Sequence, residues 1–193
     1  MTTATLEKPA KVAINGVDVP TLVATLGVVG QQPDIARFTF RAKGEWLSGT
    51  HSRIAFSDYY GAMAEQEHRQ KHTIDGDHTE VLCGADNGVT PVEMLLAGLS
   101  ACITAGIGNI ASIRQVKLHS VETTIEGDIN LNGIFGLDKS ARNGFSGVRA
   151  TFRIKGDAPD EVLEQIVQQS VARSAVFDVL TNGVPVTIAA IAG

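Results

Sequence analysis

Strict alternation of apolar and polar residues predicts two pairs of antiparallel strands. Residues 35–42 read IARFTFRA, and residues 45–56 are expected to be their partner across a turn at Lys43-Gly44. Residues 121–131 and 148–155 alternate in the same way. These two segments predict a second antiparallel pair, joined by a long loop that contains glycine.

Helical spacing appears in two further segments. Thr90, Pro91 and Glu93 match the N-cap, N1 and N3 positions of a capping box, and the helix that they begin is expected to run to about Ser112. A second helix is predicted over 159–173, because its apolar residues form one stripe. A helical turn at 175–181 and a final strand, VPVTIAAI, complete the order.

The remaining segments flank these elements. Residues 1–34 are interpreted as an N-terminal extension, with a hairpin over 11–19 turning at Asn15-Gly16 and a short helix that starts at Pro20. Residues 57–80 are polar and are interpreted as a surface excursion with a short helix, followed by a strand over 79–83. The order predicts a single α+β domain over 1–193 with antiparallel strands around two helices.

Charge and composition narrow the class of protein. The formal net charge is -5 and no basic run occurs, so the sequence gives no indication of nucleic-acid binding. Two cysteines and an N-terminus without an apolar signal core favour a reducing compartment, and we expect a cytoplasmic protein. Residues 94–113 carry no charge over the length of a membrane span, but their glycine and hydroxyl residues favour a buried helix, so no membrane contact is expected.

One cysteine has unusual neighbours in the first helix. Gly98, Cys102 and Gly106 are spaced i, i+4, i+8 and therefore share one helix face. Each internal glycine costs about 1 kcal/mol of helix stability relative to alanine. Either another helix packs closely on this face, with Cys102 a small buried residue, or the glycines keep the sulfur accessible to a small molecule.

A reactive thiol needs a lowered pKa. Cys102 lies too far from the start of its own helix for that helix dipole to act, so a cation from elsewhere is expected to be required. The candidates are His51, Arg37, Arg41 and Arg53, and the sequence does not choose among them.

Other candidate sites are weaker. Glu65, His68 and His72 have metal-ligand spacing on a predicted helix, but no further ligand converges, so a solvated face is the preferred interpretation. Cys83 is a possible second redox cysteine or a packed strand residue. No dinucleotide fingerprint or phosphate loop occurs, and neither a cofactor nor a metal is expected.

Three segments together resemble one protein family. The helix TPVEMLLAGLSACITAG, the strand pair FRAKGEWLSGTHSRI and the C-terminal stretch QQSVARSAVFDVLTNGVPVTI are similar to the OsmC/Ohr proteins, the osmotically induced and organic hydroperoxide resistance family. The likeness covers about residues 35–193. It implies an intertwined α+β homodimer, with antiparallel sheets wrapped around two central helices.

The resemblance also implies a chemistry. It places the peroxidatic cysteine, which attacks the hydroperoxide, at Cys102. The family's resolving cysteine falls at Ser174, which cannot form a disulfide, and an activating arginine falls near His51. The branch specific for hydroperoxides has a glutamate where this chain has Val92.

Two functions follow from these departures. The first is a one-cysteine peroxidase in which an organic hydroperoxide oxidises Cys102 and an external thiol restores it, with Gly98 and Gly106 bordering the substrate's path. The alternative is a non-catalytic dimer of the same fold that binds a small molecule or has a role in stress.

Overall fold

The computed structural model describes residues 12–193, and this part of the chain divides into two compact units. The first unit holds Asp18–Leu95, and the second holds Leu96–Gly193 together with Ala13–Val17. Both units combine helices with antiparallel strands, which confirms the α+β prediction. The expectation of one domain over 1–193 stays a prediction.

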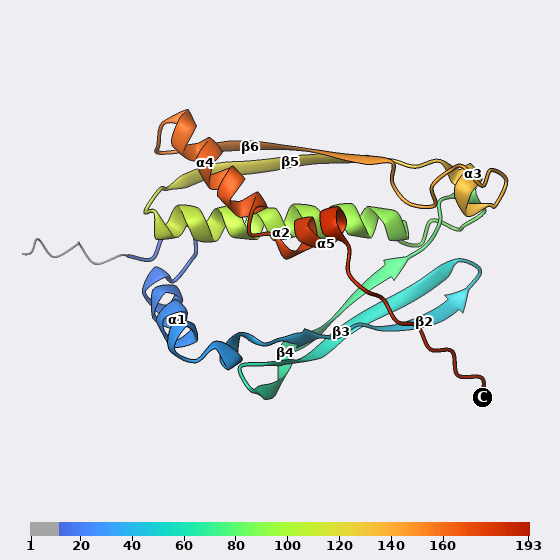
Figure 1. Cartoon of the computed structure of the whole chain (residues 1–193), viewed down its shortest axis with the longest axis horizontal. Coiled ribbons are helices and arrows are strands. Elements are labelled where there is room, and N and C mark those ends of the chain that lie inside the picture. Colours follow the sequence, from blue (N-terminus) through green and yellow to red (C-terminus); the bar gives the residue numbers. More distant parts are fainter. Residues whose placement is uncertain (1–11) are drawn as a thin grey trace, which may run out of the picture. The chain divides into compact units, whose positions relative to one another are not determined.

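A four-stranded sheet forms most of the first unit, after helix α1 (Val19–Gln31) and the 3-10 helix η1 (Pro33–Ala36). Its strands are β1 (Thr39–Phe40), β2 (Lys43–Ser48), β3 (His51–Gly61) and β4 (Ala64–Gly76), and β3 pairs antiparallel with the other three (Figure 1). The start at Pro20 is confirmed within one residue, and Asp18 caps the helix by accepting from the backbone N–H of Thr21 at 3.1 Å.

The predicted pairing at the start of this sheet is wrong. Strand β1 is only two residues long because η1 occupies residues 33–36, and β1 pairs with β3 rather than with β2. The chain turns between β2 and β3 at Gly49-Thr50, not at Lys43-Gly44. The left-handed φ of 53° at Gly49 is the reason that a glycine suits this turn.

The interpretation of residues 57–80 as a surface excursion with a helix is also wrong. This segment is the end of β3, a tight turn at Ala62-Met63 and the whole of β4. Both turn residues have positive φ, 50° and 64°, as a two-residue hairpin turn requires. The strand was missed because most of β4 is exposed on both faces, so its sequence is polar throughout instead of alternating.

The loop after β4 contains no strand. The segment predicted as a strand over 79–83 holds the 3-10 helix η2 (Glu80–Leu82). Cys83 follows it in the left-handed conformation, with φ 61° and ψ 25°. Asp77, which is 1% exposed, organises the loop by accepting hydrogen bonds from the Thr50 hydroxyl and from Asn87.

The long helix α2 (Pro91–Ile113) begins with the predicted capping box. The backbone N–H of Thr90 donates to Glu93 Oε2 at 2.8 Å, and the backbone N–H of Glu93 donates to Thr90 Oγ1 at 3.4 Å. Among the described helices, α2 is the one long and apolar enough to cross a membrane by length and composition. Its buried face nevertheless packs on protein, as a core helix does.

The second unit is built on α2. The strands β5 (Leu118–Asp128) and β6 (Gly147–Gly156) form the predicted antiparallel pair, and the short helix α3 (Leu131–Ile134) lies in the loop between them. The helices α4 (Asp160–Val171) and α5 (Ala175–Asn182) follow at the predicted places (Figure 1). The core joins α2 to α4 and to the inner face of the strand pair through Leu99, Ile103, Ile107, Leu163 and Ile166.

The two ends of the second unit differ. The predicted hairpin is present over residues 14–17, with Asn15 and Gly16 both at positive φ. Asn15 fastens it to the end of α2 by accepting from the Leu118 N–H and donating to the Val116 carbonyl. The predicted final strand over 184–191 is not a strand in the structure, and its Val186, Ile188 and Ile191 side chains are exposed.

Candidate thiol site

Cys102 lies in the middle of α2, on the helix face that it shares with Gly98 and Gly106. Its residue is half-buried and its thiol is free. Two residues earlier on the helix, the Ser100 hydroxyl is hydrogen-bonded to the hydroxyl of Thr123 on β5 at 2.7 Å. This bond, together with the core residues of α2, fixes the helix that carries the sulfur.

The Ser174 hydroxyl contacts the sulfur, and Ser174 is the residue that the resemblance places at the position of the family's second cysteine. Its hydroxyl oxygen lies 3.1 Å from Cys102 Sγ. Ser174 is 4% exposed and is the N-cap of α5, because its side chain also accepts from the backbone N–H of Phe177 at 3.1 Å. The structure therefore brings Cys102 and Ser174 together, as two of the predicted site residues.

Opposing effects act on the pKa of Cys102. Burial raises this pKa, but hydrogen bonding by the Ser174 hydroxyl and by the backbone N–H groups of Val176 and Ala175 outweighs burial, so the net pKa is lowered. The groups that lower this pKa in the described structure are neutral, and none of the candidate cations is among them. The expectation that a cation is required for a reactive thiol stays a prediction.

The two glycines have different surroundings. A Cβ built on Gly106 would collide with Ser170 Oγ, so this glycine lets α4 approach α2 closely. Ser170, 2% exposed, donates to the carbonyl of Ile103 at 2.6 Å across the same contact. A Cβ built on Gly98 would meet only Val176 Cγ1, at 3.9 Å, which is ordinary van der Waals contact. Close packing of another helix therefore explains Gly106, whereas a Cβ at Gly98 would have room.

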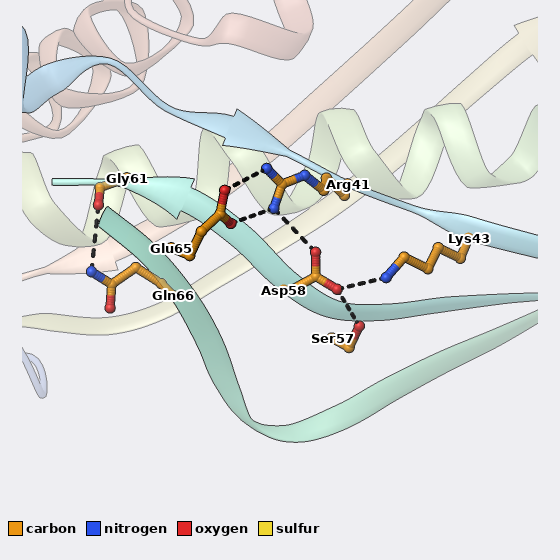
Figure 2. Close-up of polar contacts among 7 residues, drawn as sticks. All are labelled: Arg41, Lys43, Ser57, Asp58, Gly61, Glu65 and Gln66. Atoms are coloured by element: carbon orange, nitrogen blue, oxygen red, sulfur yellow. Dashed lines mark hydrogen bonds and ion pairs between the residues drawn. The ribbon is translucent and has the colours of Figure 1, made fainter. Parts of the chain in front are cut away.

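The candidate arginines all lie in the first unit, and each is paired with a carboxylate. Figure 2 shows Arg41 donating to Glu65 through both terminal nitrogens, at 2.6 and 3.0 Å, and to Asp58 at 3.1 Å. Hydrogen bonds from Lys43, Ser57 and Arg41 hold the pKa of the Asp58 carboxyl well below its usual range. Arg53 pairs with Asp75 and Arg37 with Asp34. These contacts account for the charges of all three arginines within their own unit.

His51 and Cys83 line a pocket in the first unit. This pocket of about 180 Å³ is bordered by His51, Thr50, Asp77 and Cys83 among others. The Nε2 atom of His51 is buried without a hydrogen-bond partner and lies 3.7 Å from Asp75 Oδ1. His51, near which the resemblance places the family's activating arginine, thus lies beside a carboxylate of its own sheet. Cys83 itself is exposed.

The possible metal ligands are arranged differently from the sequence prediction. Glu65, His68 and His72 lie on strand β4, not on a helix, and Glu65 is held by Arg41. The His68 and His72 rings make an edge contact, with centroids 5.4 Å apart, and the His68 ring lies 5.2 Å from the Tyr59 ring. In the described part of the chain, no three acidic, histidine or cysteine side chains gather as a metal site would require.

Sequence reasoning missed the helix start at Ser174 as a source of donors. The signal was present, because a serine directly before the amphipathic run AVFDVL is a typical N-cap. Residue 174 was interpreted only as a missing cysteine. What the sequence does not contain is the folding of α5 back onto α2, which turns that cap toward the sulfur.

The comparisons place this site in a known family. A family model described as OsmC-like protein matches residues 84–189, which is more than half of the 193-residue chain and includes both Cys102 and Ser174. The sequence matches no curated protein.

Solved structures with the same fold are distant in sequence. An OsmC-like protein from Mycoplasma pneumoniae aligns with a TM-score of 0.56 at 12% identity, over 75% of this chain and 88% of its own. An OsmC-like protein of unknown function from Vibrio cholerae gives 0.51 at 13%, over 72% and 91%. An organic hydroperoxide resistance protein, OsmC, from Legionella pneumophila gives 0.49 at 16%, over 75% and 91%. The chain is a member of the OsmC-like protein family.

Proposed function

We propose that the protein is a thiol-dependent peroxidase that reduces organic hydroperoxides through Cys102. The observation that carries the proposal is the half-buried Cys102 sulfur with the Ser174 hydroxyl 3.1 Å away and a lowered pKa. A thiolate is the form of cysteine that attacks a peroxide. Membership of the OsmC-like family supports the choice of a peroxide as substrate.

The reaction has two stages. The Cys102 thiolate attacks the distal oxygen of the hydroperoxide, the O–O bond breaks, and the alkoxide leaves and takes a proton to become the alcohol. The sulfur is thereby oxidised by two electrons to a sulfenic acid. A small thiol then condenses with the sulfenic acid to a mixed disulfide and releases water, and a second thiol frees Cys102 as a disulfide of the reductant forms.

An external reductant is part of the proposal because Ser174 offers oxygen where a second sulfur would be needed. Serine cannot condense with a sulfenic acid to a disulfide. Cys83 lies in the other compact unit and is exposed in a loop. A one-cysteine cycle needs nothing from either residue as a resolving group.

We also propose that the active form is a homodimer in the cytoplasm. Apolar side chains are exposed over the C-terminal segment, where Val186, Ile188 and Ile191 are 77%, 87% and 94% exposed. Surfaces of this kind are typical of protein interfaces rather than of the free surface of a soluble monomer. Analytical ultracentrifugation of the full chain tests this, and a monomer at micromolar concentration would contradict it.

The first experiment traps the oxidised sulfur. The protein is exposed to cumene hydroperoxide with a dimedone-type sulfenic-acid trap, and adducts are mapped by mass spectrometry. The matched variants are Cys102→Ser, which should lose the adduct, and Cys83→Ser, which should keep it. A fast adduct at Cys102, with peroxide turnover when a thiol is added, supports the proposal. Unmodified Cys102 under excess peroxide would leave the alternative of a non-catalytic binding protein.

A further inference from the structure

We propose that Ser174 is a positioning residue for Cys102: as the N-cap of α5, it directs its hydroxyl hydrogen and the first amides of that helix at the sulfur and holds it as the thiolate. This gives the serine a function of its own at the position of the family's second cysteine. The inference concerns the same sulfur as the proposed function, but it does not depend on a peroxide being the substrate.

The direction of the hydrogen bonds follows from the donors present. The backbone N–H of Phe177 can only donate, so at 3.1 Å it takes up one lone pair of the Ser174 oxygen. The hydroxyl hydrogen of Ser174 is then free to point at Cys102 Sγ, also at 3.1 Å. A thiolate only accepts, so in the ionised state this hydrogen must lie on the serine. The cap of α5 and the contact with the sulfur therefore use different parts of one hydroxyl group.

The start of α5 adds a second contribution. Its first two residues, Ala175 and Val176, have no intrahelical acceptor for their backbone N–H groups, and these groups help to lower the pKa of Cys102. A helix start carries a partial positive charge that stabilises an anion within its first turn. The Ser174 hydroxyl, 3.1 Å from the sulfur, and two neutral N–H groups of α5 thus favour the thiolate of a cysteine that is carried by another helix.

Within the described part of the second unit, the charged side chains of the elements packed on α2 are exposed to solvent. Between Met94 and Ile113, α2 has no ionisable group other than Cys102. The strands turn apolar or hydroxyl residues inward. The charged and titratable residues of the strands, of α4 and of the segment around the start of α5 are exposed; they are His119, Glu122, Glu126, Asp128, Arg149, Arg153, Lys155, Asp160, Glu161, Glu164, Arg173 and Asp178. The pH dependence of Cys102 alkylation between pH 5 and 10 should therefore report the thiol itself.

The test measures the rate of Cys102 alkylation by iodoacetamide against pH, without peroxide, in the full chain carrying Cys83→Ser. Three variants are compared with this parent. Ser174→Gly removes the hydroxyl while glycine still serves as an N-cap at a cost of only a few tenths of a kcal/mol. Ser174→Thr keeps the hydroxyl. Ser170→Ala removes a buried hydroxyl four residues earlier in the chain, which contacts the carbonyl of Ile103.

We expect the curve of alkylation rate against pH for Ser174→Gly to cross the curve of the parent. Losing one donor to a charged acceptor lowers the thiolate fraction about tenfold below the midpoint. The more basic thiolate is about threefold more nucleophilic, so the observed rate of Ser174→Gly falls only about threefold at low pH and rises about threefold at high pH. Ser174→Thr and Ser170→Ala should both follow the parent curve. A purely structural disturbance would change access to the sulfur and shift the whole curve in one direction.

Two results would overturn the proposal. One is a folded Ser174→Gly variant, checked by circular dichroism, whose midpoint equals that of the parent. The other is a Ser174→Thr variant displaced as far as Ser174→Gly, because the hydroxyl would then not be the cause. Failure of the peroxidase proposal has a different signature: the thiolate would be stabilised and alkylated as described, yet no sulfenic acid would form with peroxide.

Discussion

Two buried serines, four residues apart in the chain, contact the same face of α2 and act differently. Ser170 donates to the main-chain carbonyl of Ile103 and fills the space above Gly106, so it joins two helices. Ser174 meets the sulfur of Cys102 near Gly98, where a Cβ would still fit. The first region is a packed seam and the second is a site. The comparison teaches that the role of a glycine in this helix can be assigned only from the atoms that a Cβ at that position would meet.

Replacing Ser174 by cysteine should give the largest effect, because it changes the product of oxidation. The serine oxygen is 3.1 Å from Cys102 Sγ, so a sulfur there needs to move only about 1 Å to reach the length of a disulfide bond. We expect Ser174→Cys to turn a trappable sulfenic acid into an intramolecular disulfide. Intact mass and free-thiol titration after one equivalent of peroxide, in the Cys83→Ser background, measure this.

The matched control for that variant adds Cys102→Ser to Ser174→Cys. It keeps one thiol at the same place and cannot close the bond. If Ser174→Cys still gave a dimedone adduct at Cys102 and no loss of thiols, the arrangement of the two side chains in the structure would be wrong.

Gly106→Ala should disrupt the packed seam. Overpacking costs about 1–3 kcal/mol, and the gain in helix propensity of about 1 kcal/mol offsets part of this. We expect a net loss of up to about 2 kcal/mol in the free energy of unfolding, measured by urea denaturation. An unchanged or higher stability would show that α4 can move away from α2 without cost.

Ser170→Ala should have a smaller effect, about 1 kcal/mol, because one buried hydrogen bond is lost. The double variant Gly106→Ala/Ser170→Ala sharpens the comparison, since removing the hydroxyl relieves the collision. Its loss of stability should be less than the sum of the two single losses. Additive losses in the same urea measurements would mean that the two residues do not interact.

Gly98→Ala should have the smallest effect, and in the opposite direction. Its Cβ meets Val176 at an ordinary distance, so only the gain in helix propensity is expected, up to about 1 kcal/mol. The urea midpoint should rise while the alkylation rate of Cys102 stays within about twofold of the parent, since the sulfur is not among the atoms within 4 Å of that Cβ. A large fall in that rate would instead place the route to the sulfur directly over Gly98.

The sequence predicted the second unit well and the first unit poorly, for a physical reason. The elements α2, β5, β6 and α4 bury one face against a shared core, and burial produces the regular spacing that a reader can recognise. Strand β4 buries little, and its residues carry polar groups on both faces, so no period was visible. The opposite error occurs over 184–191. This apolar run predicts a strand, but the segment is exposed and pairs with no strand among the described residues.

For the candidate site, the sequence predicted two residues that lie in contact but did not predict the geometry of that contact. Cys102 and Ser174 were selected from the resemblance, and the structure brings them into contact. The source of the lowered pKa was sought among cations, because charge can be read from a sequence and the approach of one helix to another cannot. His51 was selected by its place in the chain and faces Asp75 within its own unit.

The contact between Ser174 and Cys102 also has a genetic consequence. Serine and cysteine codons can be interconverted by a single base change, and in this fold the two residues would occupy the same cap with the same reach to the sulfur. A single base change could therefore replace a serine that donates a hydrogen bond to the Cys102 sulfur by a cysteine that forms a disulfide with it once Cys102 is oxidised. Lineages with this helix arrangement could cross between the two states without rebuilding the fold around them.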